Sequence, residues 1–168
     1  EEWNVVGVFN WESYSQRINV PFEKLGLLRN EKYLVYESWG EDFLGEFQGA
    51  LELELQPTSS KILAIHRVLP RPQVLSTSRH ITSGAVDLDG VEWNEKKLLL
   101  SGRSVNVTPG NYTLAVWVPR GYKLAKASPA SVYQGATMIP SLLRVTFRLK
   151  YLKPFNWKLE FSRVEGQA

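Results

Sequence analysis

The 168-residue sequence contains no cysteine, only two histidines and a single methionine. The absence of cysteine excludes disulfide bridges, thiolate nucleophiles and cysteine-based zinc sites together. Because the two histidines, His66 and His80, are far apart in the chain, a transition-metal site is also disfavoured. We therefore expect neither a metal ion nor another cofactor.

Long apolar runs and targeting signals are missing as well. A membrane-spanning helix needs about 18 consecutive apolar residues, and no such run occurs, so we expect no membrane partner. No basic segment followed by an apolar stretch opens the chain, and no signal peptide is visible. The first residue is Glu1 rather than Met, which suggests a fragment of a longer protein or a processed product. The compartment is left open.

Recognisable catalytic motifs are absent too. No Gly-x-Ser-x-Gly elbow accompanies the serine and histidine around position 80, and no glycine-rich phosphate loop occurs. Carboxylates cluster at 37–46 and at 87–92, and both groups lie beside turns. This position favours hydrogen bonding in turns or exposure to solvent over a role as the paired acids of glycoside hydrolysis. At strand spacing Asp87 and Asp89 share a face, which leaves a calcium site as an alternative.

Charge is unevenly distributed, although the net charge is only +3. Residues 1–60 carry four basic and 11 acidic side chains, whereas residues 120–168 carry nine and two. A basic tail could attract nucleic acid. However, Arg144, Arg148 and Lys150 alternate with apolar residues, as on the solvated face of a strand. We interpret the two ends as complementary surfaces and expect no nucleic-acid partner.

Most segments of the sequence carry an apolar residue at every second position. Four stretches illustrate the pattern: 51–55, 112–118, 143–151 and 157–161. One side of each strand must be covered, and a β-sandwich meets this demand. No stretch repeats apolar residues at helical spacing over three turns. The prediction is an all-β antiparallel β-sandwich with about a dozen strands and little helix.

Turn residues separate these strands and mark one internal boundary. The segment 108–111 predicts a hairpin turn between strands at 105–107 and 112–114, and Leu88-Asp89-Gly90 predicts a bend or bulge. In Leu69-Pro70-Arg71-Pro72 the two prolines cannot both belong to a central strand. We expect a first β half over residues 1–68 and a second over 73–165. They form either one compact unit with closely packed halves or two small subdomains.

A dense polar stretch, Ser76 to Ser83, follows this boundary and precedes a strand predicted over Ala85 to Trp93. Within it, Arg79 offers five donors in a fixed fork, and His80 can donate and accept. We predict that both residues hold the second half against a neighbour, either the first half or a catalytic domain outside this sequence. No motif supplies the nucleophile and orienting acid that catalysis would need.

Six tryptophans and seven tyrosines in an all-β chain invite a carbohydrate-binding interpretation, because sugars stack on exposed rings. Five tryptophans fall in or beside strand patterns: Trp11, Trp39, Trp93, Trp117 and Trp157. Burial in a core or interface is the commoner use of an aromatic side chain there, and we expect at most two of the five to be exposed. Trp39 and Trp93 join Arg79 and His80 as candidate interface or ligand contacts.

Three motifs near the start resemble a known pattern: Val5-Val6-Gly7-Val8-Phe9-Asn10-Trp11, Leu25-Gly26-Leu27 and Tyr33-Leu34-Val35-Tyr36-Glu37-Ser38-Trp39. They are similar to the β-sandwich that follows the TIM barrel in alpha-galactosidases and related glycoside hydrolases, including the melibiase and raffinose-synthase-related enzymes. In that family a Y-V-x-D-x-W strand is usual, so Glu37 and Ser38 depart from the pattern. Segments 78–84, Trp93 and 100–102 also resemble C-terminal parts of these enzymes.

The resemblance implies a non-catalytic accessory domain. The family's catalytic aspartates lie on barrel strands, and this chain has no (β/α) repeats, so no catalytic residue is carried over. The expected partner is a missing N-terminal catalytic domain of the same chain, itself a glycoside hydrolase. The alternative, from another class, is an independent carbohydrate-binding module with a carbohydrate ligand.

Overall fold

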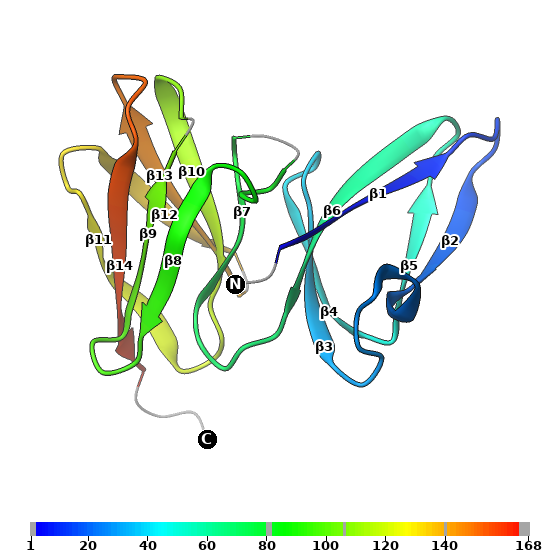
Figure 1. Ribbon diagram of the computed structural model, residues 1–168, viewed down its shortest axis with the longest axis horizontal. Coiled ribbons are helices and arrows are strands. Elements are labelled where there is room, and N and C mark those ends of the chain that lie inside the picture. The colour runs from blue at the N-terminus through cyan, green and yellow to red at the C-terminus, as the bar shows by residue number, and fades with distance from the viewer. Residues whose placement is uncertain (1–2, 80–81, 106, 140, 165–168) are drawn as a thin grey trace. The chain divides into compact units, whose positions relative to one another are not determined.

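The computed structural model describes residues 3–79, 82–105, 107–139 and 141–164, and these form an all-β protein (Figure 1). Regular structure in this part of the chain consists of fourteen strands and one short 3-10 helix, η1 (Phe22–Leu25). Every strand pair is antiparallel, which confirms the predicted fold class. The chain divides into two compact units, an N-terminal unit up to Val68 and a C-terminal unit from Leu69. The described helical segment lacks the length and apolar character that a membrane crossing requires.

The N-terminal unit consists of a four-stranded sheet of order β1-β6-β3-β4 and a two-stranded sheet, β2-β5. The strands are β1 (Asn4–Asn10), β2 (Gln16–Pro21), β3 (Lys32–Glu37), β4 (Asp42–Gln48), β5 (Ala50–Leu55) and β6 (Ser59–Arg67). Strand β5 buries Leu51, Leu53 and Leu55 and exposes the two glutamates between them, as its alternation predicts. The three leucines pack in one core with Phe22 of η1 and with residues of β1, β3 and β6.

The C-terminal unit is a sandwich of two four-stranded sheets, of order β12-β13-β10-β7 and β11-β14-β9-β8. The strands are β7 (Gln73–Thr77), β8 (Leu88–Asn94), β9 (Leu99–Ser104), β10 (Gly110–Trp117), β11 (Tyr122–Ser128), β12 (Tyr133–Ile139), β13 (Leu142–Leu149) and β14 (Phe155–Arg163). The rings of Phe147 on β13 and Phe155 on β14 lie 5.3 Å apart between centroids, so the two sheets meet through aromatic contacts. The alternating Trp157, Leu159 and Phe161 are all buried, as predicted.

Several local predictions are wrong. Residues 105 and 107 lie outside strands, and β9 and β10 belong to different sheets, so the turn at 108–111 does not close a hairpin. The same turn residues serve equally well where the chain crosses from one sheet to the other, because turn chemistry is local and strand pairing is not. Tyr151, predicted to continue the buried face of β13, lies beyond its end and is 69% exposed.

The polar stretch around Arg79 also differs from its prediction. Ser76 and Thr77 belong to β7 and are buried, rather than part of a loop. Residues 82–87 form turns, so the following strand begins at Leu88 and not at Ala85. The predicted irregularity at Leu88–Gly90 is confirmed, since the register of β8 against β9 shifts between Asp89 and Glu92.

Candidate functional site

A hydrogen-bonded network of five side chains lies inside the C-terminal unit: Thr77, Asp87, Ser104, Tyr112 and Trp157. The Nε1 of Trp157 donates to the Ser104 hydroxyl at 3.1 Å, which in turn donates to the Tyr112 hydroxyl at 2.9 Å. Tyr112 and Thr77 both donate to Oδ2 of Asp87, at 3.0 and 2.7 Å. The donors thus run in one direction, from the indole to the carboxylate.

Burial and the neighbouring carboxylate keep Tyr112 protonated within this network. Burial raises the pKa of Tyr112 far above its ordinary value, and the neighbouring Asp87 raises it further. Tyr112 therefore stays a neutral donor to the carboxylate. The second oxygen of Asp87, Oδ1, has no hydrogen-bond partner among the described residues. Asp87 and Ser104 are fully buried, and the hydrogen bonds of the network join side chains from both sheets, so the network links the two sheets from inside.

Asp87 lies in a turn, as expected, but the expected solvent role is wrong, and so is the face shared with Asp89 on which the calcium alternative depended. Asp87 is 0% exposed, whereas Asp89 is exposed on β8, so the two carboxylates do not share a face. The physical reason is that residues 82–87 turn instead of continuing as a strand, which rotates Asp87 into the interior. Among the described residues, no group of three or more His, Asp or Glu side chains is placed to hold a metal ion.

Arg79 lies beside this network and is half-buried. Its Nη1 donates to the Thr108 hydroxyl at 3.2 Å, and its backbone N–H donates to the Thr77 hydroxyl at 3.3 Å. These contacts place Arg79 within its own unit. That Arg79 also holds this unit against a neighbour stays a prediction, and His80 lies outside the described residues.

We expect Arg79→Ala to lower the free energy of unfolding by no more than about 1 kcal/mol, because it removes one partly exposed hydrogen bond. Urea denaturation of the isolated chain measures the change. Thr108→Val is the matched control, since it removes the same bond from the other side. If Arg79→Ala lowers the free energy of unfolding by more than about 2 kcal/mol and Thr108→Val does not, the guanidinium makes stabilising contacts besides its bond to Thr108.

Exposed aromatic side chains gather on β1 of the N-terminal unit. Phe9 is 49% and Trp11 81% exposed, and their rings stack with centroids 5.4 Å apart and planes within 3° of parallel. Val5 lies on the same face of β1 as Phe9, four residues earlier, and is 40% exposed. We refer to Val5, Phe9 and Trp11 as the β1 aromatic surface. Exposed apolar groups of this kind mark interaction sites more often than isolated surface residues do.

Asn10 anchors this surface from behind. It is buried, and its Nδ2 donates to the backbone carbonyls of Tyr14, Leu55 and Gln56, while its Oδ1 accepts the backbone N–H of Glu12. These bonds hold the chain on both sides of Trp11. The asparagine of the VVGVFNW motif thus has a structural role, and it gives the adjoining tryptophan a defined position.

The other tryptophans divide as the sequence predicts, with two of the five exposed. Trp39 is 57% exposed, whereas Trp117 and Trp157 are buried. Trp93 is half-buried on β8, where its ring lies edge-on to Tyr122, and its Nε1 donates to Glu95 at 2.6 Å. Of the two tryptophans predicted as contacts, Trp39 therefore offers a free ring, and Trp93 is already packed within its unit.

Glu37 closes the turn between β3 and β4. Its side chain is almost wholly buried, its Oε1 accepts the backbone N–H of Trp39, and its Oε2 accepts that of Gly40, both at 2.8 Å. Lys61 on β6 lies 3.6 Å from the same carboxylate. The acid of the third motif thus satisfies backbone donors where the chain reverses, the turn role expected for this carboxylate cluster.

We expect Glu37→Ala to destabilise the N-terminal unit by about 2 kcal/mol, because two backbone donors lose a charged acceptor. Thermal or urea unfolding monitored by tryptophan fluorescence measures the loss. Lys61→Met, which removes only the partly exposed cation, should change stability by less than about 0.5 kcal/mol. Equal losses in both variants would mean that the ion pair, and not the turn, carries the effect.

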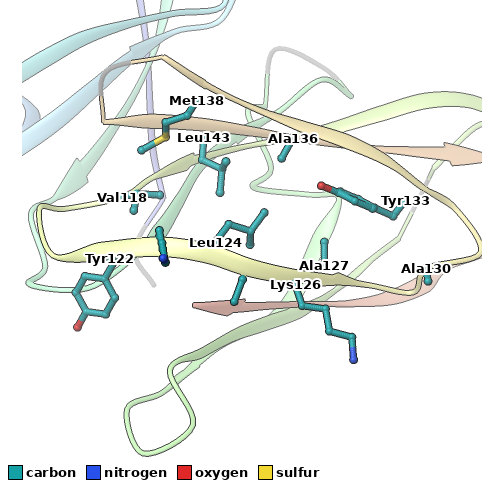
Figure 2. Close-up of a pocket in the computed structure, with 12 residues that line it drawn as sticks. Val118, Tyr122, Leu124, Lys126, Ala127, Ala130, Tyr133, Ala136, Met138 and Leu143 are labelled. Atoms are coloured by element: carbon teal, nitrogen blue, oxygen red, sulfur yellow. The ribbon is translucent and has the colours of Figure 1, made fainter. Parts of the chain in front are cut away.

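The C-terminal unit has a pocket of about 610 Å³ between β11 and β12 (Figure 2). Leu124 and Leu143 point into it from opposite sides, whereas Lys126 points away from it at the rim. The remaining lining is mainly small or apolar: Val118, Ala125, Ala127, Ala130, Ala136, Met138 and two tyrosines. Its volume lies within the ordinary range of ligand sites. Sequence reasoning missed this pocket, because its walls belong to different sheets.

The comparison with known proteins adds no assignment. No protein-family model matches the chain, and no curated protein sequence matches it. Function must therefore be argued from three features: the β1 aromatic surface, the buried Asp87 network and the pocket between β11 and β12.

Proposed function

We propose that this chain is a non-catalytic accessory β-sandwich domain of an alpha-galactosidase-like glycoside hydrolase, and that it supports a catalytic barrel of the same polypeptide. The observation that carries the proposal is the β1 aromatic surface. The first motif, residues 5–11, covers most of β1 and the residue that follows it, and it presents Phe9 and Trp11 to solvent. Aromatic residues are enriched at the buried centre of protein interfaces. A second domain that covers β1 would therefore explain why Phe9 and Trp11 are exposed when this chain is taken by itself.

The remaining motif residues have roles that suit a supporting domain. Glu37 closes a turn, and Asn10 anchors the chain beside Trp11. In the loop that follows η1, the Tyr33 hydroxyl accepts the backbone N–H of Leu28 at 2.9 Å. The residues of the three motifs therefore maintain a fold and one surface, which is what a buttressing domain requires.

The gene region upstream of the codon for Glu1 provides the first test. We expect the same reading frame to encode a barrel domain with its catalytic aspartates. A frame that contains no such region would contradict the proposal.

A second test uses the β1 aromatic surface in the full-length protein. Trp11→Ser should make the link between the domains more susceptible to limited proteolysis and lower the thermal stability of the full-length enzyme. In the isolated chain the same variant should change stability by less than about 0.5 kcal/mol, because the ring is exposed. Leu28→Ser, at a 59% exposed apolar position, is the matched control. Equal behaviour of the two variants in the full-length protein would exclude β1 as the contact.

An independent carbohydrate-binding module is the second candidate function, and the stacked rings of Phe9 and Trp11 favour it. Titration calorimetry with galactosides and polysaccharides tests this alternative. Binding that Trp11→Ala abolishes and Leu28→Ser preserves would support a module. The absence of heat across the panel, with the protein folded, would argue against it.

A further inference from the structure

The four edge strands of the C-terminal sandwich differ in how they are protected against pairing. Strand β8 carries Asp89 and Glu92 and a register shift, and β11 carries Lys123 and Lys126 and a register shift. Strand β7 is five residues long and wholly buried. Charges, irregular register and burial are the usual means by which natural sheets prevent unwanted strand addition.

Strand β12 has none of these charges. Its seven residues, Tyr133–Ile139, include no charged side chain and no proline, and no described strand pairs with its outer edge. Its register shift lies at the beginning, between Tyr133 and Gly135, and leaves the pairing from Ala136 onward regular. The strand therefore offers a run of unpaired backbone groups at an unprotected edge.

The pocket lies directly against this edge. Tyr133, Ala136 and Met138 line it from β12, opposite the buried Phe147, Val145 and Leu143 of β13. Four alanines line the pocket, at 125, 127, 130 and 136, and their short side chains leave the space between the sheets unfilled. Met138 is 52% exposed, and its flexible thioether can adapt to an incoming side chain.

We propose that the β12 edge receives an extended segment of a partner polypeptide. The segment adds a strand to the sheet and places alternate apolar side chains in the pocket, a combination of backbone pairing and side-chain recognition found in strand-addition complexes. Lys123 lines the opposite wall, so its positive charge favours an acidic residue at the end of the segment that lies near it. Lys123 and Lys126 also deter pairing with β11 itself. This inference does not depend on the accessory-domain proposal.

The test uses a synthetic peptide, acetyl-Asp-Thr-Val-Thr-Val-Thr-Val-Thr-Asp-amide, titrated into isotope-labelled protein. We expect amide chemical-shift changes and slowed hydrogen exchange at 136–138. Two further peptides carry backbone N-methyl groups, one on all odd-numbered amides and the other on all even-numbered amides. Only one of these sets faces β12, so one peptide should bind like the parent and the other about 10-fold or more weakly.

Variants of the pocket complete the test. Ala136→Leu fills the space and should weaken binding of the parent peptide about 10-fold. Ala130→Leu, in the turn between β11 and β12, serves if Ala136→Leu fails to fold. Lys123→Gln should weaken binding of the parent peptide, with its aspartate ends, more than binding of a version with serine ends. Lys153→Gln, outside the pocket, should affect the two peptides equally.

Four outcomes would overturn the proposal. The first is no binding of the parent peptide at millimolar concentration, and the second is equal binding of the two methylated peptides. The third is binding of decanoate in the pocket while every peptide fails, which would identify an apolar small-molecule site. The fourth is concentration-dependent protection of β12 in the protein alone, which would identify a second copy as the occupant.

Discussion

Asp87→Ala is expected to lower the free energy of unfolding of the C-terminal unit by about 4 kcal/mol, since it leaves two buried hydroxyl donors unsatisfied. Thr77 and Tyr112 both donate to this carboxylate, at 2.7 and 3.0 Å, and the burial of the network keeps water from replacing it. Trp157 and Ser104 supply the rest of the donor chain, so the disturbance extends to the centre of the sandwich.

Urea denaturation monitored by tryptophan fluorescence measures this loss, because Trp157 belongs to the network. Asp89→Ala removes the same group two residues later at an exposed position, and we expect less than about 0.5 kcal/mol. Asp87→Asn keeps an acceptor oxygen and should lie between the two. A double-mutant cycle with Tyr112→Phe should give a coupling above about 0.5 kcal/mol, since the residues share a hydrogen bond. A loss below about 1 kcal/mol for Asp87→Ala would show that the network does not tie the sheets.

Gly102→Ala is expected to cost about 3 kcal/mol, because the new methyl group would overlap a ring that cannot move. Gly102 on β9 lies opposite Trp157 on β14, and a Cβ at this position would come within 2.6 Å of the indole Cζ2. The indole is fully buried, and its Nε1 is bonded to Ser104, so neither rotation nor displacement relieves the overlap. Thermal unfolding by calorimetry measures the effect.

Gly7→Ala is the matched control for this overlap. Its Cβ would approach the Phe9 ring at 2.9 Å, but Phe9 is 49% exposed and can turn into solvent. We expect the free energy of unfolding to change by less than about 1 kcal/mol in either direction, because Ala lowers the conformational entropy of the unfolded chain and so offsets part of the overlap. Trp157→Leu in combination with Gly102→Ala should recover part of the loss relative to Trp157→Leu alone. If Gly102→Ala and Gly7→Ala change the stability equally little, Trp157 does not pack closely over β9.

The sequence by itself determined the fold class and the faces of its most regular strands. The alternation in β5 and β14 places leucines or aromatics on one side and charged residues on the other, and no helical register competes with it. The irregularity at Leu88–Gly90 and the upper limit of two exposed tryptophans also follow from local residue types, whereas the exposure of Trp11 does not. These features depend on neighbours in the chain, and a single sequence contains that information.

Tertiary structure alone decided where Asp87 lies and which partners it has. Sequence spacing put Asp87 on the same strand face as Asp89, but a turn ends before Leu88, and the donors come from β7 and β10. The same holds for the pocket, whose walls belong to strands of opposite sheets that do not pair with each other. The need for glycine at position 102 likewise comes from Trp157, which lies opposite it on β14. Each of these features arises from pairing between residues far apart in the chain, and that pairing is set by the packing of whole sheets rather than by local pattern.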